Sequence, residues 1–151
     1  MWLSSTAQQA IHAVLCIAGG GGEPLRVESI AEATGLPRNY LSKTLHALTR
    51  AGILRSERGP RGGFRLARTA DRLTLAAVAA PFSRSDQRRC LLGRPTCGDA
   101  NPCPAHARWS EIAGGLEEYF RSTTIAHLLK DTSPRHSIAR TRHGSHRPTP
   151  R

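Results

Sequence analysis

The hydrophobic positions in the first fifty residues recur with helical spacing. From Ala7 to Ala18 apolar side chains lie three or four residues apart, which predicts an amphipathic helix that ends at the glycine run 19–22. A short second helix is predicted from about Val27 to Thr34, and a third from about Pro37 to Gly52. The apolar side of the third helix carries Leu41, Leu45 and Leu48. Two helices joined by so short a turn are typical of a helix-turn-helix motif.

The pattern changes after the third helix. Two short strand-like runs, Ile53–Glu57 and Phe64–Ala67, flank a turn rich in glycine and proline, which predicts a β-hairpin. A further apolar run, Leu73–Ala80, is predicted to be helical. A helix-turn-helix followed by a basic hairpin makes a winged helix. The predicted fold class is therefore mostly α, with a small β-hairpin wing.

A long helix is predicted near the end of the ordered chain, from about Pro104 to Arg121. Its large apolar residues are separated by gaps of three, four and three, and they are Trp109, Ile112, Leu116 and Tyr119. Such a single apolar seam between polar flanks favours packing against a partner helix. Residues Thr123–Leu129 predict a short closing helix, and the polar, proline-containing stretch after Asp131 predicts a disordered basic tail.

The charge of the chain is concentrated rather than spread. The net charge is +11; residues 38–72 hold nine Lys/Arg against two acidic residues, and residues 131–151 hold five Arg against one Asp. An excess gathered in one segment and one tail favours an anionic polymer as partner. The basic segment lacks the aromatic-rich amphipathic face that a membrane surface would require. The chain also has no long apolar run and no secretory signal, so we expect a cytoplasmic protein.

Double-stranded DNA is the expected anionic polymer. With the leucines of the third helix buried, its exposed side presents side chains that bond base edges and phosphates, namely Arg38, Asn39, Ser42, Lys43 and His46. Because recognition helices contact bases mainly near their N-terminus, Arg38, Asn39 and Ser42 are the expected base contacts. Arg58 and Arg61, at the wing tip, are expected to reach a minor groove or a phosphate. An ordinary solvated helix and hairpin would not explain the concentration of charge.

Three of the four cysteines fall in one short loop. With a following histidine they form the pattern C-x6-C-x5-C-x2-H, made by Cys90, Cys97, Cys103 and His106. Thiolates bind iron–sulfur clusters and zinc, and an imidazole can replace one thiolate. Free structural thiols in a loop rich in glycine and proline would be poorly buried and easily oxidised. The pattern therefore indicates a metal site that holds an iron–sulfur cluster or, as the main alternative, zinc, with a loop without metal as the third possibility.

The segment Tyr40–Arg68 closely resembles the winged helix of the Rrf2 family of bacterial transcription regulators, which includes IscR-like and NsrR-like proteins. The resemblance covers about residues 1–130. It implies a homodimer joined by the long helix, a pseudo-palindromic operator, and an iron–sulfur cluster held by three cysteines. The IscR-like loop reads C-x5-C-x5-C-x2-H, so the first gap here is one residue longer. The cluster type, [2Fe-2S] or [4Fe-4S], stays open.

The resemblance leaves two candidates for the fourth ligand. His106 matches the position of the IscR-like histidine. In some members the first helix of the partner subunit supplies a ligand, and His12 lies where one such ligand falls. Gln8, one turn before it, occupies the position of a common acidic ligand, and a neutral amide is a poor ligand. Cys16 continues the same helical stripe but is expected to be a half-buried helix residue.

These inferences divide the chain into four parts. They are a winged helix-turn-helix DNA-binding domain (1–82), a cysteine-rich cluster-binding loop (83–104), a dimerisation helix with its closing helix (104–130) and the basic tail (131–151). The expected function is a homodimeric repressor that senses iron, redox state or nitric oxide through the cluster. The alternative is a zinc-stabilised DNA-binding protein without sensing. We expect no enzyme, because no nucleophile–base motif, phosphate-binding glycine loop or C-x-x-C is present.

Overall fold

The computed structural model describes residues 3–83 and 90–131, so nearly all of the predicted basic tail lies outside the described residues. Its elements are α1 (Ser5–Gly19), α2 (Val27–Thr34), α3 (Arg38–Arg50), β1 (Leu54–Glu57), β2 (Gly63–Leu66), the 3₁₀ turn η1 (Ala70–Arg72), α4 (Leu75–Ala79), the 3₁₀ turn η2 (Ala80–Phe82), α5 (His106–Ser122) and α6 (Ile125–Asp131). The predicted fold class is confirmed. The predicted helix Leu73–Ala80 is shorter than expected, because Leu73 and Thr74 are extended and pair with the segment before α6.

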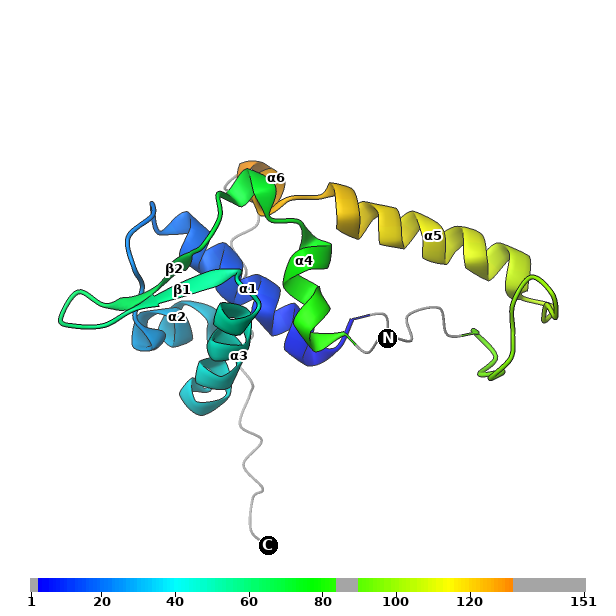
Figure 1. Ribbon diagram of the computed structural model, residues 1–151, viewed down its shortest axis with the longest axis horizontal. Helices are drawn as coiled ribbons and strands as arrows, with labels where there is room; N and C mark the ends of the chain where they lie inside the picture. Colours follow the sequence, from blue (N-terminus) through cyan, green and yellow to red (C-terminus); the bar gives the residue numbers. More distant parts are fainter. Residues whose placement is uncertain (1–2, 84–89, 132–151) are drawn as a thin grey trace, which may run out of the picture.

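Helix α1 is the centre of the winged-helix body (Figure 1). The Ser4 hydroxyl caps it by accepting a hydrogen bond from the Ala7 N–H at 3.1 Å. Its buried face carries small and branched side chains that let other helices approach closely: Ala7, Ala10, Ala13, Val14 and Ile17. Helices α2, α3, α4 and α6 all pack on it. The hydrophobic core therefore gathers around one helix.

The helix-turn-helix is set by one glycine and three leucines. Gly35 ends α2 with φ of 70°, a left-handed conformation that glycine adopts without steric strain. This turn leads directly into α3, which buries the three predicted residues Leu41, Leu45 and Leu48 completely. The opposite side of α3 is consequently held out toward solvent.

The wing is attached to the body by a short third segment. Strands β1 and β2 pair antiparallel, and Leu25 extends the sheet by exchanging hydrogen bonds with Phe64 at 2.8 and 2.9 Å. The Arg26 guanidinium donates to the Pro60 carbonyl in the wing turn. The hairpin projects from the body (Figure 1), and β1 packs against α3, so the wing and α3 are neighbours.

Gly63 is the residue at which this attachment can be tested. A Cβ at this position would lie 2.5 Å from the Leu25 carbonyl oxygen, so Gly63→Ala has to push the wing away from the body. We expect a loss of about 1–3 kcal/mol in the free energy of unfolding, measured by urea denaturation. Gly19→Ala is the control, because a Cβ there meets nothing within 4 Å. An unchanged midpoint for Gly63→Ala would contradict the attachment.

Helix α5 leaves the body, and the cysteine-containing loop lies at its far end (Figure 1). Its near end is fixed by hydrogen bonds from Leu75 N–H to Thr123 O at 2.9 Å and from Ile125 N–H to Leu73 O at 2.8 Å. Only Ala113 is buried along the helix. No helix within the described ranges is both long and apolar enough to cross a bilayer.

Candidate metal centre and DNA-binding surface

The exposed face of α3 carries a regular stripe of polar and basic side chains. Asn39, Lys43 and His46 are exposed and are separated by four and three residues, so they lie on one side of the helix. Arg50 lies four residues further and is also exposed. Sequence reasoning missed Arg50, although the same spacing would have found it. The His46 ring also packs edge-on against Phe64 of β2, with centroids 5.7 Å apart, which joins the stripe to the wing.

Two predicted base contacts lie at the edge of this face. The Arg38 guanidinium forms an ion pair with Glu28 of α2, and both side chains are more than half exposed. Ser42 is half-buried. Arg38 is therefore exposed as predicted but already paired, whereas Ser42 is less exposed than predicted. Packing of α2 against the start of α3 brings the Glu28 carboxylate to Arg38.

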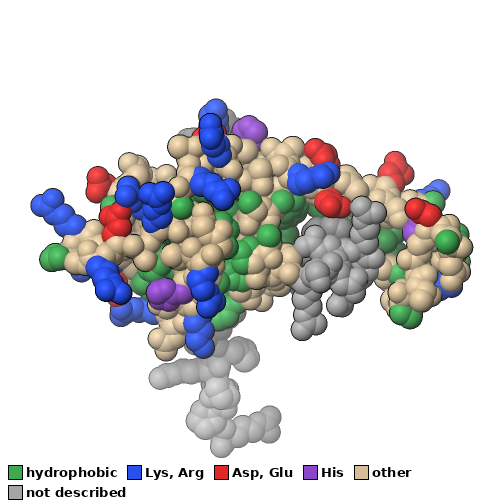
Figure 2. Space-filling view, in the orientation of Figure 1, with side chains coloured by type: hydrophobic (Ala, Val, Ile, Leu, Met, Phe, Trp, Pro, Cys, Tyr) green, Lys and Arg blue, Asp and Glu red, His purple; other side chains and the backbone are tan. Residues whose placement is uncertain are grey.

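The wing tip presents the two predicted arginines. Arg58 and Arg61 are both exposed, on either side of a turn closed by a hydrogen bond from Gly62 N–H to Gly59 O at 2.9 Å. A Cβ on Gly62 would meet the Glu57 carbonyl oxygen at 2.3 Å, so the tight turn depends on glycine there. Lys and Arg side chains gather along the wing and over α3 on the face shown in Figure 2.

The loop before α5 brings its three cysteines together. The sulfur atoms of Cys90, Cys97 and Cys103 all lie within 4.8 Å of one another, and those of Cys90 and Cys103 are 3.5 Å apart. Cys103 is buried, and the other two are half-buried. Tight turns shape the loop: the N–H groups of Gly93 and His106 bond the carbonyls of Cys90 and Cys103, both at 2.9 Å.

His106, the first residue of α5, faces this group of sulfurs. Its Nδ1 lies 3.3 Å from Cys97 Sγ, and its Nε2 lies 3.0 Å from the Asp99 carboxylate. A carboxylate on Nε2 favours the tautomer with the proton there, which leaves the Nδ1 lone pair directed at the sulfurs. Metal-binding histidines commonly have such a carboxylate partner. Asp99 was missed because nothing in its spacing distinguishes it from other exposed loop acids.

The alternative ligand lies elsewhere in the chain. His12 is exposed on α1, and α1 belongs to the body while the loop lies at the far end of α5 (Figure 1). No contact recorded among the described residues joins His12 to the loop. Cys16, on the same helix, is half-buried, and burial raises the pKa of its thiol. Within one chain, the structure therefore groups His106 but not His12 with the three cysteines.

Cys90 and Cys97 differ in how readily their thiols ionise. Hydrogen bonds from the backbone N–H of Arg94, and more weakly from that of Leu92 and from the neighbouring thiols, lower the pKa of Cys90 to about 7. The Cys103 N–H lowers the pKa of Cys97, but burial and the two neighbouring thiols outweigh it, so this pKa is raised. The thiolate is the form of a cysteine that binds a metal ion, so the lowered pKa of Cys90 favours metal binding at this residue.

The donor set fits both metal groups considered from the sequence. Three sulfurs and one imidazole nitrogen are ligands of zinc and of iron–sulfur clusters. A tetrahedral zinc ion with Zn–S of about 2.3 Å places its sulfurs about 3.8 Å apart, which the present arrangement nearly meets. A cluster divides its thiolates between different irons and is larger, so the loop would have to widen around it.

Residues 3–131 match the Rrf2 family, described as an iron-dependent transcriptional regulator. The chain belongs to the Rrf2 family. An HTH-type transcriptional regulator of Aquifex aeolicus is 33% identical over 85% of this chain and 92% of its own length. The HTH-type transcriptional regulator IscR of Vibrio campbellii is 29% identical over 87% and 79%. The predicted family is thereby confirmed.

Solved structures agree with the Rrf2 assignment. IscR of T. potens has a TM-score of 0.69 and 26% identity, covering 87% of this chain and 88% of its own. CymR of B. subtilis, the global cysteine regulator, has a TM-score of 0.72 over 87% and 98%, and at 22% identity it supports the fold alone. The protein is thus a DNA-binding transcription regulator and, as predicted, not an enzyme.

Proposed function

We propose that this Rrf2 regulator is a homodimeric repressor that senses iron, redox state or nitric oxide through an iron–sulfur cluster. Cys90, Cys97 and Cys103 hold the cluster, and His106 is its fourth ligand. The observation that carries this proposal is the convergence of three sulfurs within 4.8 Å beside the Nδ1 of His106. The likeness to IscR proteins adds support. When bound, the cluster would supply reversible one-electron redox chemistry and iron atoms that can react with nitric oxide.

The chain offers a physical route from the loop to the DNA-reading helix. The loop leads into α5, which packs on α4, and α4 in turn packs on α1. In the first turn of α1, the Thr6 hydroxyl bonds the Tyr40 hydroxyl on α3. A change in the order of the loop then biases the position of α1 and α3, and hence the angle between the two recognition helices of a dimer.

Anaerobic purification followed by absorption spectroscopy and counts of iron and sulfide tests the proposal. We expect a brown protein with iron and inorganic sulfide in matching amounts. The second candidate, a zinc-stabilised regulator without sensing, is favoured by the close spacing of the sulfurs. It requires a colourless protein with one zinc per chain.

DNA affinity is expected to fall steeply with salt. Several Lys/Arg contacts in each half of a dimer should give a slope of about −5 or steeper for log affinity against log salt, since each phosphate contact contributes about −0.9. Arg61→Ala should weaken binding to all sequences equally, whereas Asn39→Ala should also relax base preference. Titrations against duplex DNA measure both effects. A slope near zero would contradict DNA binding through this face.

A further inference from the structure

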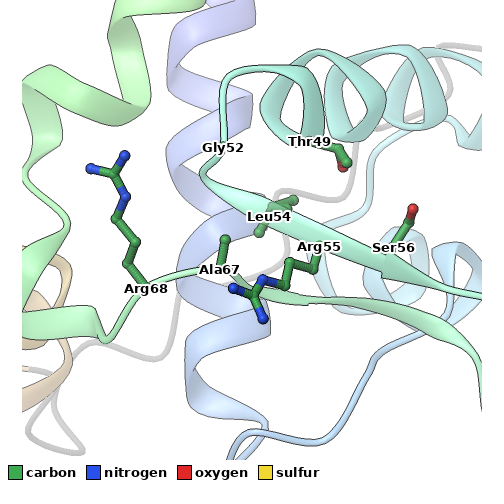
Figure 3. A pocket seen from close by; sticks show the side chains of 7 residues that line it. All are labelled: Thr49, Gly52, Leu54, Arg55, Ser56, Ala67 and Arg68. Carbon is green, nitrogen blue, oxygen red and sulfur yellow. The ribbon is translucent and has the colours of Figure 1, made fainter.

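A groove of about 570 Å³ lies between the end of α3 and the base of the wing (Figure 3). It is open to solvent, and its lining residues come from several separate segments of the chain. Thr49 lines it from α3, Arg55 and Ser56 from β1, and Arg68 from the segment after β2. None of these residues was among the DNA contacts expected from the sequence.

The groove carries two arginines that lack acidic partners. Arg55 and Arg68 are exposed, and within the described residues no ion pair or hydrogen bond engages either guanidinium. Other arginines of this surface differ, since Arg65 pairs with Glu57 and Arg38 pairs with Glu28. Arg55 also faces the like-charged Arg65 across the hairpin. The Glu57 carboxylate on Arg65 offsets this like-charge pair, so among the described residues Arg55 is the member of the pair without an acidic partner of its own.

The hydroxyl groups of the groove have different roles. Thr49 Oγ1 donates to the Leu45 carbonyl at 2.9 Å, so its proton is already used within α3. Ser56 also lines the groove, but its hydroxyl points to the other side of β1 from the Arg55 side chain (Figure 3). The available charged donors are therefore the guanidinium groups of Arg55 and Arg68. This combination suits a phosphate group, which accepts several charge-assisted hydrogen bonds.

The position of the groove indicates which phosphate it would meet. It adjoins the C-terminal end of α3, next to the exposed stripe that ends at Arg50. From Arg38 to Thr49 the helix advances about 16 Å, at 1.5 Å per residue. A major groove is about 12 Å wide, so a helix whose N-terminal part reads bases brings its other end close to the sugar–phosphate backbone.

We propose that this wing-base groove binds a phosphate of the DNA backbone through Arg55 and Arg68, and so extends the DNA footprint beyond α3 and the wing tip. The inference rests on the proposed DNA-binding function. It assigns to these residues a contact that positions the protein without reading sequence. A free anion such as inorganic phosphate has the same chemistry, and the test separates it from DNA.

The test compares the wild type with the double variant Arg55→Gln/Arg68→Gln in titrations against random-sequence duplex DNA over a range of salt. Losing one phosphate contact per protomer should make the slope shallower by about 0.9, or about 1.8 for a dimer engaging both halves. Affinity should fall about tenfold at ~0.15 M salt, equally for all sequences. Arg72→Gln is the control, because Arg72 is exposed nearby on η1 but does not line the groove.

The outcomes distinguish the inference from the function it rests on. A steep wild-type slope that the double variant leaves unchanged would overturn the groove proposal. A wild-type slope near zero would instead overturn DNA binding itself. A further measurement compares the melting temperature in inorganic phosphate with that in chloride at matched ionic strength. Stabilisation by phosphate that the double variant loses, with its DNA slope unchanged, would assign the groove to a free anion and contradict the DNA backbone contact.

Discussion

Replacing Cys97 with alanine is expected to give a colourless, iron-poor protein that is still folded. Cys97 Sγ lies near the other two sulfurs and near His106 Nδ1, so the alanine variant loses the ligand that adjoins all the others. No neighbouring side chain offers a thiolate in its place, and iron–sulfur clusters depend on thiolate ligation. The body should survive, because the hydrophobic core cluster contains no residue of the loop.

The measurements are iron and sulfide content after anaerobic purification, with circular dichroism to check folding. Cys16→Ser is the matched control, because this half-buried cysteine lies on α1 and should leave the iron content and spectrum unchanged. Full iron in Cys97→Ala would exclude the three-cysteine site. One zinc ion per chain in the wild type and none in the variant would show that the three cysteines bind zinc instead of an iron–sulfur cluster.

Two histidine variants separate the candidates for the fourth ligand. His106→Ala should change the visible spectrum or shorten the life of the cluster in air, because the imidazole next to Cys97 is lost. His12→Ala should do so only if α1 of a second copy completes the site. Unchanged spectra and full iron in both variants would exclude histidine ligation.

The fold was largely predictable because its signals are local. The glycine and proline residues that flank these elements predicted the observed bounds of α2. They also predicted the bounds of both wing strands to within one residue of those observed. Hydrophobic periodicity identified the three leucines that α3 buries. The shortening of α4 was not predictable, because it depends on Leu73 and Thr74 pairing with residues some fifty positions later. Local pattern carries no information on such distant pairing.

The features of the candidate sites also differ in whether local sequence could predict them. Three cysteines separated by gaps of six and five residues are confined to a small volume by chain length alone, so the sequence could indicate a metal site. The Asp99 carboxylate on His106 depends on how the loop turns at Gly98 and Asn101. The wing-base groove depends on how α3 meets the ends of the hairpin. Both features required the arrangement of the backbone in space.

Substituting glutamate for Ile112 is expected to convert the proposed homodimer into a folded monomer. The side chains of Ile112 and Tyr119 are 62% and 50% exposed, which is unusual for residues of this size, and they lie seven positions apart on one side of α5. Leu116, between them, is half-buried within its own chain. A carboxylate at position 112 therefore remains solvated in the single chain but would be buried and unpaired against a second copy.

That asymmetry makes Ile112→Glu a sharper test than Leu116→Glu, in which the charge would also disturb the chain's own packing. An uncompensated buried charge destabilises by about 3–5 kcal/mol, and a symmetric interface contains it twice, so the dissociation constant should rise by at least two orders of magnitude. Gly114→Glu places the same charge on the other side of α5, where a Cβ meets nothing within 4 Å, and should remain dimeric. Sedimentation velocity measures the oligomeric state of the wild type, Ile112→Glu and Gly114→Glu. If the Ile112→Glu variant is still a dimer, the subunits join through another surface. A dimer interface formed by α5 around position 112 would bury two unpaired carboxylates and would dissociate.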